Sequence, residues 1–106
     1  YCCENLTSVT IPNSVTEIED SAFSFSGLIS VTIPNSVTKI GKSAFMNCWR
    51  LTSVYCKSTT SPSLGEYVFN KNAPGRKIYV PRNSIEAYKT AEGWKTYADA
   101  IVGYDF

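Results

Sequence analysis

The chain of 106 residues has no histidine, no excess of one charge and no long apolar run. Without histidine, a serine or cysteine nucleophile lacks its commonest base, and no Gly-x-Ser-x-Gly motif occurs, so we do not expect an enzyme. Ten Lys and Arg residues stand against nine Asp and Glu residues, a balance that gives no field to gather nucleic acid. No stretch of about 18 apolar residues could span a membrane, and no signal peptide is visible at the start.

One segment occurs twice almost letter for letter, as LTSVTIPNSVT over 6–16 and LISVTIPNSVT over 28–38. Such a fixed period indicates a stacked-repeat protein, in which successive coils share one core. Strand-like hexads follow in the same register, with steps of 22, 23 and 24 residues, and predict four parallel strands. Positions one, four and six of the first three hexads should face inward, and positions two, three and five outward. The predicted strands are 6–11, 28–33, 51–56 and 75–80.

Further apolar positions predict the opposite wall of each coil. Val15-x-x-Ile18 recurs as Val37-x-x-Ile40, and a Ser-Ala-Phe triplet follows each pair. We expect Phe23, Phe45 and Phe69 to stack in the core rather than to contact a ligand, because regularly spaced apolar residues normally fill a solenoid.

The C-terminal part departs from the repeat. Segment 57–64 replaces the Pro-Asn-Ser-Val-Thr turn, and Asn83-x-x-Glu86 is typical of a capping box that opens a helix. Gly93 interrupts this helix, and residues 94–102 should continue as a second helical turn or as an irregular tail over the open end. We therefore predict one domain, with coils over 1–81 that begin in mid-repeat and a C-terminal cap over 82–106.

The four cysteines favour neither a metal site nor a disulfide. There is no Cys-x-x-Cys pair, and Cys3 and Cys48 occupy the same slot two coils apart, near 10 Å at about 4.8 Å per strand. We expect both to be buried free thiols. Cys2 either covers the end of the chain or faces solvent as a reactive or dimer-forming thiol. No metal or cofactor is predicted.

The repeat unit, read as Leu-Thr-Ser-Val-Thr-Ile-Pro-Asn-Ser-Val-Thr-x-Ile-x-x-Ser-Ala-Phe-x-x-Cys, resembles the BspA-like branch of the leucine-rich repeat family. The likeness is close over 1–56, and parts of 78–94 resemble the cap of such proteins from gut and oral bacteria. It implies a strand-dominated leucine-rich-repeat solenoid of the α/β horseshoe class, a parallel β stack with a C-terminal helical cap. Ser14 and Ser36 stand where the wider class has asparagine, so their hydroxyls are expected to substitute.

The resemblance also implies a bacterial cell-surface or secreted protein. Members of the family are commonly linked to adhesion, host-matrix binding or contact between microbes. The implied partner is therefore a protein or a glycan, from host matrix or from another microbe, and no nucleic acid.

The outward strand positions are the candidate binding face. The tyrosines among them, with neighbouring cations, would form an aromatic and cationic patch suited to sugars or acidic peptides. The alternative is that Tyr and Thr simply favour strands. The predicted ligand-binding residues are Tyr55, Tyr79, Arg76, Lys77, Thr32 and Thr10.

Carboxylates offer a weaker catalytic alternative. Glu17 and Asp20 could in principle perform acid and base chemistry, but Lys39 and Lys42 occupy the same slots one coil later, so we expect exposed charge pairs. The predicted function is thus a non-catalytic binding or adhesion module. Its rival is a structural spacer, the capped end of a longer solenoid that carries another functional domain.

Overall fold

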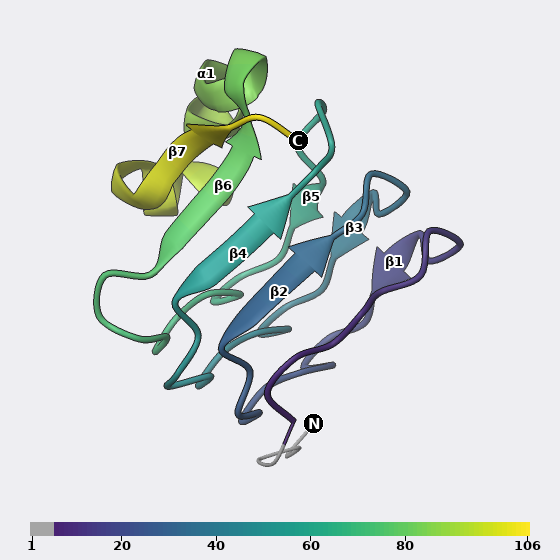
Figure 1. The fold of residues 1–106 in the computed structure, drawn as a ribbon, viewed down its shortest axis with the longest axis vertical. Coiled ribbons are helices and arrows are strands. Elements are labelled where there is room, and N and C mark those ends of the chain that lie inside the picture. The colour runs from purple at the N-terminus through teal and green to yellow at the C-terminus, as the bar shows by residue number, and fades with distance from the viewer. Residues whose placement is uncertain (1–5) are drawn as a thin grey trace.

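The computed structural model describes residues 6–106 as a stack of coils whose C-terminal end is covered by short helices (Figure 1). Turns connect the strands, and each coil contributes strands to two sheets that lie on opposite walls of the stack. The elements in chain order are β1 (Glu17–Ile18), β2 (Ser30–Ile33), β3 (Lys39–Ile40), β4 (Ser53–Cys56), β5 (Ser63–Leu64), β6 (Lys77–Pro81), the 3₁₀ helix η1 (Arg82–Ser84), α1 (Ile85–Thr90), the 3₁₀ helix η2 (Trp94–Ala100) and β7 (Ile101–Tyr104).

Two parallel sheets form the walls. The four-stranded sheet has the order β2-β4-β6-β7, and the three-stranded sheet has the order β1-β3-β5. Val31 pairs with Val54 and Val54 with Ile78, so each step across the larger sheet moves one coil along the chain. All three side chains are buried, as predicted for the inward positions. The parallel stack is therefore confirmed.

The predicted strand over 6–11 is wrong as a full strand. In this segment the structure has a single parallel bridge, between Thr10 and Thr32, and one backbone bond from the Ile29 N–H to the Thr7 carbonyl. The first described coil has neighbours on one side only, so fewer ladder bonds hold its backbone straight. The irregular segment 57–64, by contrast, keeps the coil: Leu64 pairs with Ile40 across the smaller sheet.

The phenylalanines stack between the two sheets as predicted. The ring centroids of Phe23 and Phe45 are 5.4 Å apart, and those of Phe45 and Phe69 are 5.8 Å apart, with nearly parallel planes. Backbone bonds accompany the stack, because the Phe23 N–H donates to Ala44 and the Phe45 N–H donates to Val68. The turns that carry these rings form a third side of each coil.

This third side has a recurring backbone shape that the sequence pattern did not predict. Two residues per coil have positive φ near 60°, four positions apart, and few of them are the asparagines that favour this region. The ladder of backbone bonds between coils holds them there. They are Ser21 and Phe25, Ser43 and Asn47, and Tyr67 and Lys71.

Side chains complete the bonding of each turn. The buried Cys48 thiol donates to the Phe23 carbonyl over 3.1 Å, and Asn72, in the same slot one coil later, donates to the Phe45 carbonyl over 2.9 Å. The prediction of a buried free thiol at Cys48 is confirmed, while Cys2 and Cys3 lie outside the described residues. Ser36 also donates to the Val15 carbonyl over 2.7 Å, so a hydroxyl substitutes for the usual asparagine.

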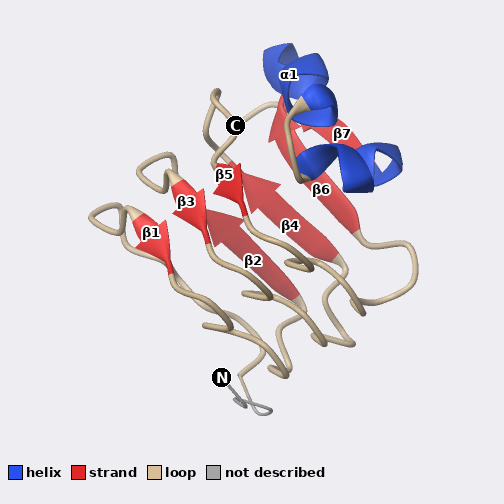
Figure 2. Ribbon diagram, turned by 180° about the vertical axis from the view of Figure 1, so that it is seen from behind, coloured by secondary structure: helices blue, strands red, loops and turns tan. Residues whose placement is uncertain are grey.

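The cap lies behind β6 and β7, on the side of the smaller sheet (Figure 2). The predicted helix is present as α1, but the capping box is wrong: no side-chain hydrogen bond caps it, and Ser84 donates instead to the Thr59 carbonyl. Trp94 and Tyr88 are fully buried over the last coil. The predicted second helical turn is present as η2. It leads into β7, which pairs with β6 as the last strand of the larger sheet and which the sequence pattern missed.

Candidate ligand-binding face

The outward column of the larger sheet runs through successive strands in register. Thr10 pairs with Thr32, Thr32 with Tyr55, and Tyr55 with Tyr79. Neighbouring parallel strands lie about 4.8 Å apart, so these four side chains form one continuous row. The structure therefore brings together the four column residues that the sequence predicted.

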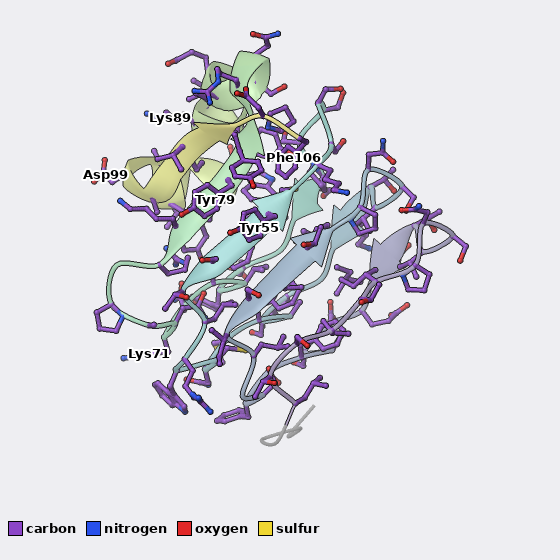
Figure 3. All side chains as sticks on the ribbon, viewed as in Figure 1. Tyr55, Lys71, Tyr79, Lys89, Asp99 and Phe106 are labelled. Atoms are coloured by element: carbon purple, nitrogen blue, oxygen red, sulfur yellow. The ribbon has the colours of Figure 1, made fainter. Side chains whose placement is uncertain are left out.

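Aromatic side chains gather at one end of this row, where Figure 3 shows Tyr55, Tyr79 and Phe106 near one another. The rings of Tyr55 and Tyr79 stack with centroids 4.8 Å apart and planes 13° apart. Tyr104 packs edge-on against both, at 5.4 Å from Tyr55 and 5.6 Å from Tyr79. Phe106 follows at 4.8 Å from Tyr104. We call Tyr55, Tyr79, Tyr104 and Phe106 the tyrosine cluster.

Sequence reasoning missed Tyr104 and Phe106, although both are exposed, at 42% and 50%. They come from the end of the chain, outside the repeat, where no column predicts their neighbours. The run Ile101-Val102-Gly103-Tyr104 was the available signal, because β-branched and aromatic residues favour strands.

An ion pair holds the end of the chain beside the cluster. Arg82 Nε lies 2.8 Å from Asp105 Oδ1, and both side chains are largely exposed. The hydrogen bond from Arg82 and its charge lower the pKa of Asp105. Asp105 stands between Tyr104 and Phe106, so this pair ties the end of the chain to Arg82 of η1.

A half-open groove of about 310 Å³ continues the row past Tyr55. Thr10 and Thr32 line it together with Asn13 of the first turn and the ring of Pro34. Lys57 also lines it, and this lysine occupies the slot that Pro12 and Pro34 hold in the two preceding coils. We call this hollow the threonine groove.

The two predicted cations have different positions. Lys77 is exposed on the outward face of β6, where it lies opposite Ser53 of β4 in the strand register. Arg76 does not join this row, because its side chain turns toward the end of the core: Nη2 donates to the Phe69 carbonyl over 2.7 Å, and the guanidinium lies 5.0 Å from the Tyr97 ring centroid. Burial lowers the pKa of Arg76. Arg76 thus binds the Phe69 carbonyl as Cys48 and Asn72 bind the Phe23 and Phe45 carbonyls of the preceding coils.

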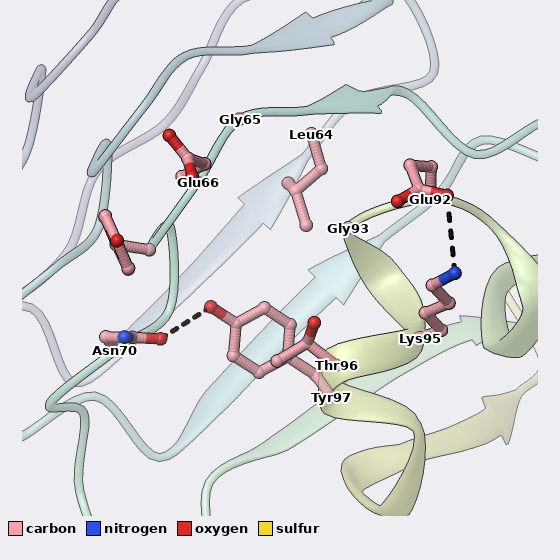
Figure 4. A pocket seen from close by; sticks show the side chains of 10 residues that line it. Leu64, Gly65, Glu66, Asn70, Glu92, Gly93, Lys95, Thr96 and Tyr97 are labelled. Carbon is pink, nitrogen blue, oxygen red and sulfur yellow. Dashed lines mark hydrogen bonds and ion pairs between the residues drawn. The ribbon is translucent and has the colours of Figure 1, made fainter.

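A larger hollow, of about 380 Å³, lies between the third coil and the cap (Figure 4). Four of its lining residues contact one another in pairs: the Tyr97 hydroxyl donates to Asn70 over 2.8 Å, and Lys95 lies 3.4 Å from Glu92. The same hydroxyl accepts the Phe69 N–H over 3.2 Å. This hollow therefore belongs to the closure of the solenoid.

The acidic residues near β1 do not gather into a reactive site. Glu17 is in register with Lys39, as predicted, but the ion pairs among residues 6–106 are Arg82 with Asp105 and Lys95 with Glu92. Asp20 instead accepts the backbone N–H of Lys42 over 2.9 Å. Within the same residues, no group of three or more side chains is arranged to hold a metal.

Coils of 22 to 24 residues, two parallel sheets and a helical cap define a strand-dominated leucine-rich-repeat solenoid. The family described as BspA type Leucine rich repeat region (6 copies) matches residues 1–91, and the chain belongs to this family. A comparison with curated proteins gave no match. Proteins of this family are repeat modules, commonly found at surfaces or in binding, and are typically non-enzymatic. No helix within residues 6–106 is long and apolar enough to cross a membrane.

Proposed function

We propose that the chain is a non-catalytic protein- or glycan-binding module of a bacterial cell-surface or secreted leucine-rich repeat protein. Its role is adhesion, to host matrix or to another microbe. The observation that carries this proposal is the tyrosine cluster, with Tyr104 and Phe106 exposed and Tyr55 and Tyr79 half-buried, which lies in one row with the threonine groove on the outer face of the larger sheet.

The composition of this surface supports binding. Tyrosines provide a large contact area with little loss of side-chain freedom, and they are enriched among residues that dominate binding energy. The faces of β2, β4 and β6 that point into the core are filled by Val, Ile and Cys, so burial does not require aromatic residues on the outer face. A contiguous group of exposed and half-buried aromatic side chains is typical of interaction sites.

A structural spacer is the second candidate, and one observation favours it. Tyr55, Tyr79 and Tyr104 contact one another, so the cluster could serve to hold β7 and the end of the chain on β6. In that case the face would stabilise the capped end of a solenoid without binding anything.

Replacement of both Tyr55 and Tyr79 by alanine separates the two candidates. The binding module should lose attachment to a panel of immobilised matrix proteins, bacterial cells and glycans, while its circular dichroism spectrum and thermal midpoint show whether the fold persists. Tyr67→Ala is the matched control, because this tyrosine is 50% exposed but lies on the third side of its coil. Attachment that survives the double substitution would support the spacer.

A further inference from the structure

The larger sheet presents a positive charge beside its aromatic cluster. Among β2, β4, β6 and β7, Lys77 is the single charged residue, and Lys57 follows directly after β4. Neither lysine forms an ion pair with the described residues, whereas Arg82 is neutralised by Asp105. Two free ammonium groups therefore flank the row of threonines and tyrosines.

We infer that this face binds an extended acidic segment of a partner protein, with a carboxylate in the threonine groove and an apolar side chain against the tyrosine cluster. The inference rests on the proposed binding function and narrows it to one class of partner. Charge complementarity carries it, because the groove offers one ammonium and two hydroxyls to a ligand, and no carboxylate among residues 6–106 lines it.

The chemistry of the threonine groove suits a carboxylate. Lys57 provides a charge-assisted donor, and the hydroxyls of Thr10 and Thr32 provide two more hydrogen-bonding groups on the same side. Proline at this slot, as in the two preceding coils, would provide no donor at all. Lys57 is thus the residue that gives the groove its preference for an anion.

The geometry of the tyrosine cluster favours a protein over a glycan. Tyr55 and Tyr79 come from adjacent strands and stack on each other, so each ring covers one face of the other. A sugar needs a free ring face to lie on, whereas ring edges and hydroxyls suit apolar side chains and peptide groups. Tyr104 packs edge-on against both rings and covers a further part of their surface.

The spacing of the two subsites sets the register of the segment. From the middle of the Thr10–Thr32 pair to the middle of the Tyr55–Tyr79 pair is two strand spacings, or about 10 Å. An extended chain covers this distance in about three residues. The segment should therefore carry Asp or Glu about three residues from a Leu, Phe or Tyr.

The test uses a synthetic array of twelve-residue peptides, in which one Asp is placed one to eight residues from one Leu. Each peptide has a matched version with Asn in place of Asp, and a glycan array with neutral and sialylated sugars runs in parallel. We expect binding of the Asp peptides to peak near a spacing of three residues. It should exceed binding of the Asn versions by about two- to fivefold, and weaken in high salt.

Two variants locate the effect. Lys57→Glu should abolish the preference for Asp over Asn peptides, while Lys71→Glu, a lysine away from the tyrosine cluster in Figure 3, should leave it unchanged. Equal binding of Asp and Asn peptides, or an unchanged preference in Lys57→Glu, would overturn the inference.

The glycan array separates this inference from the proposed function. Suppose that the wild type binds glycans but no peptides, and that the Tyr55→Ala and Tyr79→Ala double variant loses glycan binding. This outcome would support the binding module but overturn the inference of an acidic protein partner. Binding to neither array would count against both.

Discussion

The repeated coils and the cap close the same hydrogen-bond ladders by different means. Between coils, the Phe23 and Phe45 amides donate to backbone carbonyls of the next coil, whereas the Phe69 amide donates to the Tyr97 hydroxyl. The phenylalanine carbonyls are bound by side chains throughout: Cys48 and Asn72 donate to those of Phe23 and Phe45, and Arg76 donates to that of Phe69. The amide of each earlier coil is thus bound by the backbone of the next coil, but the amide of the last coil is bound by a side chain, because no further coil follows it within the described stack.

The largest expected effect tests whether the cap is as much a part of the core as the coils are. Phe45→Ala and Trp94→Ala should each lower the free energy of unfolding by about 3 to 5 kcal/mol, since both side chains are fully buried. Urea unfolding followed by circular dichroism measures this. Phe23→Ala, at a partly exposed position in the first coil, is the control and should lose less. A loss below about 1 kcal/mol for Trp94→Ala would mean that the cap folds separately.

Alkaline pH should weaken the junction of coil and cap next. Burial raises the pKa of Cys56 to about 11 from 9.0, and burial also raises the pKa of Tyr88, which bonds to that thiol over 3.3 Å. The folded state therefore keeps protons that the unfolded chain releases. Stability is fully present below pH 9 and falls as pH rises toward 11, by about 3 kcal/mol from Cys56.

The measurement is the unfolding free energy in urea at pH 8, 9, 10 and 11. Cys56→Ala is the control, and it should remove the part of the fall that begins at pH 9. A wild-type curve that stays flat to pH 11 would contradict the assignment of a buried neutral thiol.

A smaller effect is expected from removing the Tyr97 hydroxyl, which binds the amide of the last coil. Tyr97→Phe keeps the ring against Phe69 but removes both the acceptor for the Phe69 N–H and the donor to Asn70, so we expect a loss of about 1 to 2 kcal/mol. Thermal and urea unfolding of the variant measure it, with Tyr67→Phe as an exposed control. An unchanged stability would show that solvent serves the Phe69 amide equally well.

The smallest effect concerns the end of the chain. The pKa of Asp105 is lowered by Arg82, so the ion pair persists at neutral pH and is lost as pH falls through that lowered value. Asp105→Asn at neutral pH should loosen Tyr104 from the tyrosine cluster with little change in global stability. Ring-current shifts of the Tyr55 protons in NMR spectra report the contact, and shifts equal to those of the wild type would contradict this role.

The predictions from sequence succeeded where the period applies. The inward Val and Ile positions, the phenylalanine stack and the row Thr10, Thr32 and Tyr55 follow from one repeat, because adjacent parallel strands place equivalent positions side by side. The Arg76 side chain leaves the outer face for a local reason. It stands at an outward position of the pattern, but its guanidinium finds an unsatisfied carbonyl and two aromatic rings at the end of the core.

The amino-acid sequence by itself determined the coil, its register and the family, since a fixed period with apolar residues at the same positions allows one way to bury them together. Tertiary structure alone decided how the stack ends: that Ile101–Tyr104 adds a parallel strand, that Tyr104 joins Tyr55 and Tyr79, and that Arg76 leaves the outer face. These outcomes depend on which backbone groups and ring faces remain unpaired at the last coil. A local sequence pattern does not predict which groups remain unpaired, because the side chains and the strand that bind them come from other parts of the chain.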